Sequence, residues 1–125
     1  MIRDLSLDYP DFLIASSEWF AFVPAKEYFD EPGDHADELE TSVMMHYHPE
    51  LVNLDEAGNG DYKKFTSQML NEKVAWIPRN WQKVSQDTGI GNPKKASAGK
   101  GKKYAEAVVA KYALLFEELV HKELY

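Results

Sequence analysis

The chain has 125 residues, of which 44% are hydrophobic and 13% aromatic, and a formal net charge of −7 at pH 7. A chain of this length builds one globular domain or a piece of one, because it has too few residues for two hydrophobic cores. The absence of cysteine excludes disulfides, thiolate metal ligands and cysteine nucleophiles, so any metal must be bound by His, Asp or Glu. No apolar run approaches the roughly 18 residues of a membrane span. Residues 1–4 show no signal-peptide pattern, and we expect a cytoplasmic location.

The two halves of the sequence carry opposite charges. Residues 1–62 hold two basic and 15 acidic side chains, a balance of −13, whereas residues 63–125 hold 12 basic and six acidic ones, a balance of +6. We therefore expect the halves to attract each other. One run of basic residues is typical either of a nucleic-acid-binding patch or of solvated lysines before a helix. The acidic total favours the second interpretation, so neither a nucleic-acid nor a membrane partner is expected. The run comprises Lys94, Lys95, Lys100, Lys102 and Lys103.

The first part of the chain predicts a helix followed by a buried strand. Ile2 and Leu5 keep helical spacing and Pro10 ends the segment, so residues 1–8 are predicted to form the end of a helix. This helix has no capping residue before its first turn, which indicates that an upstream part of the fold is missing. Residues 12–16, with the sequence FLIAS, are typical of a strand buried on both faces of a parallel sheet. A short helix is predicted to follow, from Pro24 to Phe29.

Two longer helices are predicted in the rest of the chain. The first spans about residues 36–47, where Asp34 can cap it, acidic side chains fill its first turns and Pro49 ends it. The second spans residues 101–123, where an apolar stripe predicts an amphipathic helix packed on a sheet. Between them, residues 63–92 are ambiguous, although residues 74–77 could form a short strand. The apolar stripe comprises Ala105, Val108, Val109, Tyr112, Phe116, Leu119 and Val120.

His35 is the strongest candidate for chemistry. It lies where a turn meets the predicted helix, one helical turn before Glu38. An imidazole carries protons near neutral pH, and a carboxylate at this spacing can orient it. The spacing alone leaves open whether His35 is catalytic or a capping or surface residue. The remaining histidines do not form a zinc-binding pattern and are interpreted as structural or surface residues: His46, His48 and His121.

Three further residues have two interpretations each. Asp37 and Glu40 have the spacing of a capping box, in which both side chains serve the start of the helix. Trp19 follows the predicted strand, at the edge of an open α/β sheet where ligands bind. Its indole therefore either lines a small-molecule pocket or packs in the core.

Two motifs carry a resemblance to a known family. The run HADELETSVMM over residues 35–45, continued by PELV over 49–52, is similar to the signature His-Ala-Gly-Glu-x-Glu-Thr-Ser of the creatininase (creatinine amidohydrolase) family. Residues 88–93 and 96–101 resemble that family's Gly-Asp-Pro, Ala-Thr and Gly segment before its last helix. The similarity runs over most of the chain, and the first motif is the more specific.

The resemblance implies a fold class of α/β type, with α/β/α layers and a long C-terminal helix. It also implies hydrolysis of a non-peptide carbon–nitrogen bond in a small or cyclic amide. A pair of divalent metal ions, zinc or manganese, is implied for the full family fold. At the matched positions, the resemblance implies that His35 is the catalytic residue that transfers protons and contacts substrate. It likewise implies that Glu40 is a supporting catalytic group and that Trp19 binds substrate.

Departures from the family pattern lead to further expectations. The segments that carry the family's metal ligands, an early Glu-x-His, a following Asp and an Asn-Gly-His-Gly-Gly-Asn loop, do not occur in this sequence. Residues 1–125 are therefore interpreted as one partial domain, the C-terminal half of the family fold, which holds no metal alone. Asp37 replaces the signature glycine and Glu31 stands where creatininases proper have a substrate-gating tryptophan, so creatinine is not the expected substrate.

These expectations leave two main functional classes open, beside the less favoured binder that would act through the basic run from Lys94 to Lys103. As part of an amidohydrolase, the isolated chain should be inactive and should pair with the missing N-terminal half or form homo-oligomers. The alternative is a non-catalytic, truncated module that serves only in assembly or binding.

Overall fold

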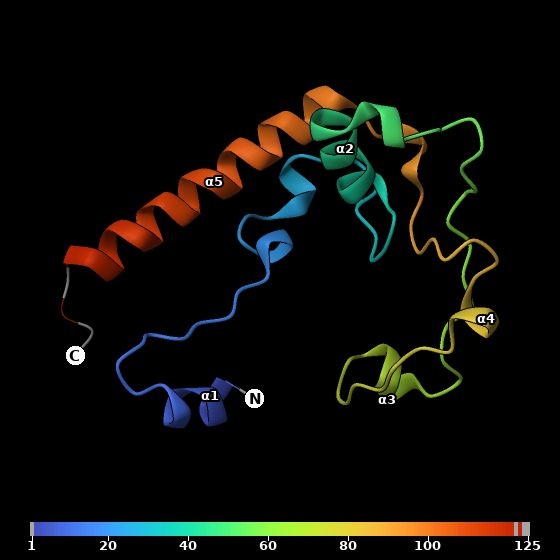
Figure 1. Ribbon diagram of the computed structural model, residues 1–125. Coiled ribbons are helices and arrows are strands. Elements are labelled where there is room, and N and C mark those ends of the chain that lie inside the picture. Colours follow the sequence, from blue (N-terminus) through green and yellow to red (C-terminus); the bar gives the residue numbers. More distant parts are fainter. Residues whose placement is uncertain (1, 122, 124–125) are drawn as a thin grey trace.

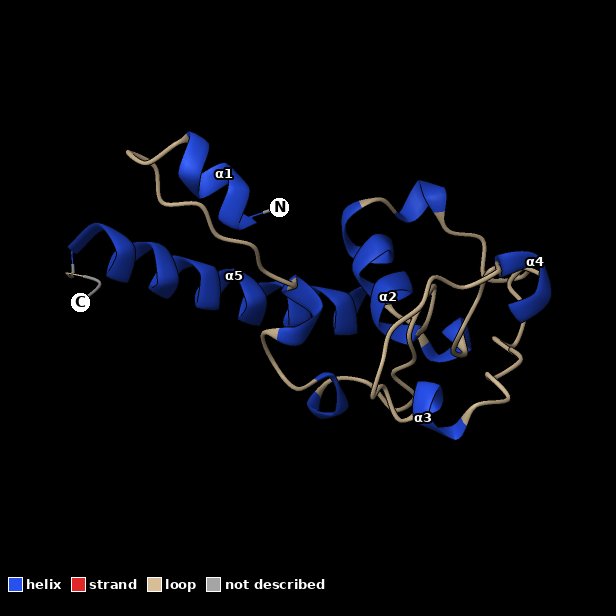
Figure 2. Cartoon of the chain, turned by 90° about the horizontal axis from the view of Figure 1, so that it is seen from below, coloured by secondary structure: helices blue, strands red, loops and turns tan. Residues whose placement is uncertain are grey.

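A computed structural model describes residues 2–121 and 123 of the chain. These residues form helices joined by long loops, and no strand occurs among them (Figures 1 and 2). The α-helices are α1 (Ile2–Asp8), α2 (Glu38–Tyr47), α3 (Gln68–Asn71), α4 (Trp81–Val84) and α5 (Ala98–His121). The 3-10 helices are η1 (Trp19–Ala21), η2 (Ala25–Glu27), η3 (Pro49–Leu51) and η4 (Pro93–Lys95). No described helix is both long and apolar enough to cross a membrane.

The core lies where α2 packs on the first half of α5. It contains the buried side chains of Phe29, Leu39, Tyr104 and Val108. Tyr104 is 0% exposed, and its hydroxyl donates a hydrogen bond of 2.8 Å to the carbonyl of Phe20. Burial raises the pKa of this hydroxyl, which keeps the phenol neutral and able to donate. The core thus joins α2 and α5 to the chain segment that contains η1 and η2.

A glycine allows the two long helices to approach closely. A side chain at Gly101 of α5 would overlap the backbone carbonyl of Ser42 in α2. The Ser42 hydroxyl is itself buried and accepts a hydrogen bond of 3.1 Å from the backbone N–H of Ser97, just before α5 begins. Small side chains at the crossing therefore fix the position of α5 on α2.

The predicted helix over residues 36–47 is confirmed as α2, with a different capping residue. The side chain of Asp37, not of Asp34, caps it by accepting a hydrogen bond of 2.9 Å from the backbone N–H of Glu40. The cap residue His48 and then Pro49 end the helix. The predicted last helix is also confirmed as α5, although it begins earlier, at Ala98.

The strand predictions are wrong for this structure. Residues 12–16 form an irregular, largely exposed segment, and residues 74–77 are not a strand either. A strand in a parallel sheet needs neighbouring strands on which to form hydrogen bonds, and the described residues offer none. For the same reason α5 packs on α2 and not on a sheet. The predicted α/β layering is therefore absent from the described part of this chain.

The chain has two exposed extensions from the core. All described residues of α1 are exposed, and Figure 1 shows it far from α2, joined to η1 by an open loop. The second half of α5 projects beyond the core, and there its apolar stripe is no longer packed against the rest of the chain. Tyr112 is half-buried, whereas Phe116 is 59% exposed. The amphipathic stripe was predicted from spacing, but only its first half is packed.

Ion pairs join the acidic and basic halves of the chain, as the charge balance predicts. Lys95 pairs with Glu31 at 2.7 Å, and Lys100 pairs with Asp30 at 2.8 Å. The lysines from η4 to α5 therefore include two that are bound to carboxylates within the chain.

Candidate active site

The loop of residues 33–37, which we name the His35 loop, is fastened to a glycine-containing segment near the end of the chain. His35 and Ile90 form an antiparallel bridge, with backbone hydrogen bonds of 3.1 Å and 2.8 Å. Gly91 has a φ of +122° and packs on Gly33, so that a Cβ atom at position 91 would lie 2.8 Å from the Gly33 Cα. The two resembling motifs thus meet in space, and each holds the other in place.

The side chain of His35 lies beside a carboxylate and an indole. Its Nδ1 atom is 3.7 Å from Oε2 of Glu40, and its side chain is 46% exposed. The ring centroid of Trp81, at the start of α4, is 5.0 Å from that of His35. The imidazole therefore has a carboxylate and an indole as neighbours and is still accessible from solvent.

Glu40 also braces the loop that carries His35. Its Oε2 atom accepts a hydrogen bond of 2.6 Å from the backbone N–H of Ala36. Ala36 has a φ of +48°, a conformation that a residue with a side chain seldom adopts without support. Asp37 and Glu40 thus both serve the start of the helix, as the capping-box interpretation predicts. The difference is that Glu40 accepts a hydrogen bond from the N–H of Ala36 and not from that of the cap residue Asp37.

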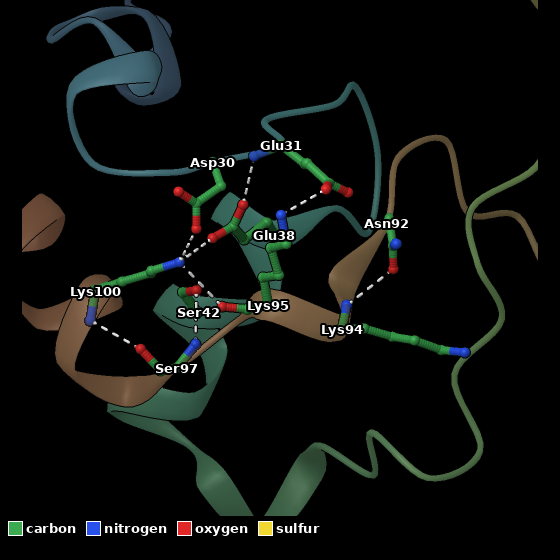
Figure 3. A network of polar contacts seen from close by, with 9 residues as sticks. All are labelled: Asp30, Glu31, Glu38, Ser42, Asn92, Lys94, Lys95, Ser97 and Lys100. Carbon is green, nitrogen blue, oxygen red and sulfur yellow. Dashed lines mark hydrogen bonds and ion pairs between the residues drawn. The ribbon is translucent and has the colours of Figure 1, made fainter.

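Glu38 does not orient His35, contrary to the prediction from spacing. Its side chain is fully buried and accepts a hydrogen bond of 2.7 Å from the backbone N–H of Glu31. Its other oxygen forms an ion pair with Lys100 (Figure 3). A carboxylate is buried only at a cost unless it is paired, and here both oxygens have partners. Glu38 is a structural anchor for the start of α2.

Lys100 stands at the centre of this polar network. Besides Glu38 it binds Asp30 and the backbone carbonyl of Lys95, the last at 3.2 Å (Figure 3). Its hydrogen bonds to Asp30 and then to Glu38 raise the pKa of its ammonium group. The same contact lowers the pKa of Asp30. The network ties the start of α5 to the loop that leads into the His35 loop.

Trp19 and Trp81 differ in their surroundings. Trp19 packs edge-on against Tyr104, with ring centroids 6.1 Å apart, and belongs to the rim of the core. Trp81 lies against His35, and the guanidinium of Arg79 is 5.6 Å from its ring centroid. Arg79 in turn forms an ion pair with Asp34 in the His35 loop. Sequence reasoning missed Trp81 and Arg79, because they lie in the segment without clear periodicity; the opposite charges of Arg79 and Asp34 were the available indication.

A small open pocket lies next to the His35 loop. Its volume is about 220 Å³, and Ala36 forms part of its wall. Four glycines and three polar side chains, Asn53, Glu56 and Asp87, line much of the remainder. Hydrogen bonds from the backbone N–H of Gly89 and then from Ser85 lower the pKa of Asp87. The pocket is of a size for a small polar molecule.

The described residues do not fit a metal pair. They contain no group of three or more His, Asp or Glu side chains that could hold a metal ion. His35 and Glu40 are close together, but a metal centre needs further ligands.

The site defines a class of chemistry. A half-exposed imidazole lies 3.7 Å from a carboxylate, in a loop whose next residue, Ala36, lines a small pocket, and this arrangement suits proton transfer to a small molecule. The chain belongs to the creatininase family, since the family's sequence profile, described as creatinine amidohydrolase, matches residues 2–116.

A solved structure supports this membership. The crystal structure of a predicted creatinine amidohydrolase from Bacteroides fragilis NCTC 9343 is 59% identical in sequence and superposes with a TM-score of 0.91. The superposition covers 99% of this chain and 49% of that chain. This chain therefore spans about half the length of that relative. No curated protein matches the sequence.

Proposed function

We propose that this chain is the C-terminal half of a creatininase-type amidohydrolase that acts on a small or cyclic amide. The observation that carries the proposal is the placement of His35: it lies in the family signature, 3.7 Å from Glu40 and accessible to solvent. The 49% coverage of the solved relative supports the view that further residues belong to the working domain. The chemistry of each residue follows from what amide hydrolysis requires.

Hydrolysis adds water to the amide carbonyl carbon and breaks the carbon–nitrogen bond. The departing nitrogen must gain a proton, because an amide anion is a very poor leaving group. In our proposal the His35 imidazolium donates this proton, and the neutral imidazole recovers one from the water that has added to the carbon. The atoms and charges then balance over the cycle. Glu40 is a positioning residue, because its Oε2 atom accepts a hydrogen bond from the Ala36 N–H and lies 3.7 Å from Nδ1 of the imidazole.

Trp19 and Trp81 differ in how well each is placed to bind substrate. The family match proposes Trp19 as a substrate-binding residue, whereas its contact with Tyr104 favours packing in the core. Trp81 contacts His35 and is the better placed to cover a bound substrate.

The resemblance also proposes a zinc or manganese pair. Because the described residues of this chain do not group into a metal site, we propose that its ligands lie outside the chain. The chain alone should then show no turnover. Purified chain that bound two metal ions and hydrolysed a cyclic amide without any partner would contradict this proposal.

A test needs the missing part of the domain. The half of the Bacteroides fragilis protein that this chain does not cover can be supplied as a separate polypeptide, and release of amine or carboxylate can be measured over a panel of small and cyclic amides. We expect His35→Ala to lower kcat by about 100-fold or more, the usual loss when a general acid is removed. Glu40→Gln should lower kcat less, with KM nearly unchanged.

The matched control is His48→Ala. His48 is exposed and pairs with Glu50 at 3.1 Å, at the opposite end of α2 from His35. Its replacement should leave kcat within about twofold, a difference that corresponds to less than 0.5 kcal/mol. Equal losses in both histidine variants would refute a specific role for His35.

The second candidate function is a non-catalytic module for assembly or binding. The exposed apolar side chains of the N-terminal segment and of α5 favour it. If a complex with the other half forms but His35→Ala leaves every measured activity unchanged, this second function is the correct one.

A further inference from the structure

The segment between α1 and η1 presents an apolar surface that the described chain does not cover. We name residues 9–17 the N-terminal arm. Phe12 is 69% exposed and Leu13 59% exposed, although both lie in the most apolar run of this part of the sequence. Together with Tyr9, Ile14 and Ala15 they line a shallow hollow of about 490 Å³. Neighbouring apolar groups that remain in water mark a contact site.

The backbone of the arm is free of hydrogen bonds only in its second part, since the N–H groups of Tyr9 and Phe12 donate hydrogen bonds to the carbonyls of Leu5 and Tyr9. Among the described residues, no backbone hydrogen bond engages the N–H or carbonyl groups of residues 13–17. The side chain of Ser17 forms the arm's link to α5, a hydrogen bond of 2.7 Å with the Tyr112 hydroxyl. A segment with unpaired backbone groups and apolar side chains on successive residues is suited to join a sheet as an added strand.

The apolar surface continues from the arm onto α5. Phe22 packs on Tyr112, with ring centroids 4.4 Å apart, and Tyr112 stacks on Phe116 at 5.9 Å. Phe116 lies one turn beyond Tyr112 on the same helix face, and it is there that the cover from the rest of the chain ends. The uncovered part of α5 and the arm therefore meet at Tyr112.

We propose that the N-terminal arm and the exposed face of α5 around Phe116 dock the other half of the creatininase-type domain, which pairs a β-strand with residues 12–16. This inference rests on the proposed function in so far as the chain is part of a larger domain. The relative in Bacteroides fragilis supplies the argument for the occupant. Its superposition covers 99% of this chain, so it includes the arm, yet it uses only 49% of that protein. Residues that can hold the arm are thus available in the other half of that chain.

The charge of the arm argues against a second copy of the same chain as the occupant. Asp8 and Asp11 flank the start of the arm, and its basic neighbour, Arg3, lies at the other end of α1. Two arms paired strand to strand would bring carboxylates of like charge together, which destabilises a sheet. A polypeptide of different sequence avoids this repulsion.

The experiment uses the complete 125-residue chain and the half of the Bacteroides fragilis protein that this chain does not cover. Light scattering after size exclusion gives the mass of any complex, and titration gives its Kd. We expect a one-to-one complex in which hydrogen exchange at residues 12–17 slows. Leu13→Asp should raise the Kd by about 30-fold or more, because it places a charge in the centre of the interface. Leu13 is exposed in the free chain, so this variant should keep the helical content of the parent.

The matched control is Trp76→Asp, since Trp76 is 83% exposed and lies outside the proposed surface. Its Kd should stay within about twofold of the parent value. Equal weakening by both variants, or no weakening by Leu13→Asp, would overturn the proposal. A homodimer of this chain that slows exchange in the arm would also overturn it.

The outcome separates this inference from the proposed function. His35→Ala should bind the other half as tightly as the parent. If the complex forms through the arm but shows no turnover, the docking surface stands and the amidohydrolase proposal fails. If turnover appears and arm variants assemble normally, the docking surface is wrong and the amidohydrolase proposal stands.

Discussion

The two halves of α5 show how differently one helix can be used. The first half buries Gly101, Tyr104, Ala105 and Val108 against α2 and neighbouring segments. The second half, with the same apolar periodicity, leaves Phe116 and other apolar residues exposed. Periodicity therefore predicts which face of a helix packs against other residues, but not whether those residues belong to the same polypeptide. The N-terminal arm is not helical, but it also has an apolar sequence whose side chains are exposed.

The covered half of α5 also contributes to the candidate site. Lys100, near its start, pairs with the buried Glu38 of α2, and Glu40 of the same helix braces the His35 loop. The family signature thus serves two purposes at once. Some of its side chains fold the start of α2, and others present the imidazole.

The largest expected difference between the covered half of α5 and the exposed N-terminal arm is in what each contributes to the free energy of unfolding. Tyr104→Ala removes a side chain that is 0% exposed and contacts three aromatic rings, so the free energy of unfolding should fall by about 4 kcal/mol. Phe12→Ala in the arm should change it by less than about 0.5 kcal/mol, because the ring is largely in water already. Urea titration of the purified chain measures both values. A cost at Phe12 close to that at Tyr104 would show that the arm is packed within the chain.

Gly101 tests how closely the covered half of α5 must approach α2. Gly101→Ala places a Cβ atom against the Ser42 carbonyl, and we expect a loss of about 2 kcal/mol in unfolding free energy. Gly99→Ala, two residues earlier in α5, meets no atom within 4 Å. It should stabilise the chain by up to about 0.5 kcal/mol, because alanine is the better helix former. Equal effects in both variants would mean that the helices separate easily.

The sequence predicted the parts of the fold that local rules govern. Periodicity and the end at Pro49 predicted α2, and the apolar stripe predicted α5. The opposite charges of the two halves predicted ion pairs such as Lys95 with Glu31. The strand over residues 12–16 was wrong because a strand is defined by its neighbours, and these are not among the described residues.

The candidate site was only partly accessible to the same reasoning. The position of His35 predicts a role in chemistry, but its spacing predicts Glu38 as its partner, whereas the structure brings Glu40 near. Glu38 lies three positions after His35 in the sequence, a spacing that implies contact only within a regular helix. Here the helix begins at Glu38 and Ala36 has a left-handed conformation, so His35 is not part of the helix. Trp81 is brought near His35 by long loops and by the ion pair between Arg79 and Asp34, and no local sequence pattern predicts such a contact.

The smallest expected effect is the pH dependence contributed by the lysine network. The pKa of Asp30 is lower in the folded chain, through its bond to Lys100, so this contact stabilises the fold above the usual value of 3.8 and is lost as the pH falls below it. The pKa values of Lys100 and Lys95 are raised, so their contribution is complete below 10.5 and is lost as the pH rises above it.

Urea midpoints between about pH 2 and pH 7 can isolate the acidic side of this dependence. Asp30→Asn should flatten the fall in stability toward acid pH by a small amount, because Asp30 is largely exposed and solvent screens its charge. In a Lys100→Met background the same substitution should have a much smaller effect, since the main partner that lowers the pKa is gone and only the weaker attraction of Lys95 is left. If Asp30→Asn flattened the curve equally in that background, the carboxylate would draw its stabilisation mainly from another cation, and Lys100 would not be the link between α5 and the loop before the site.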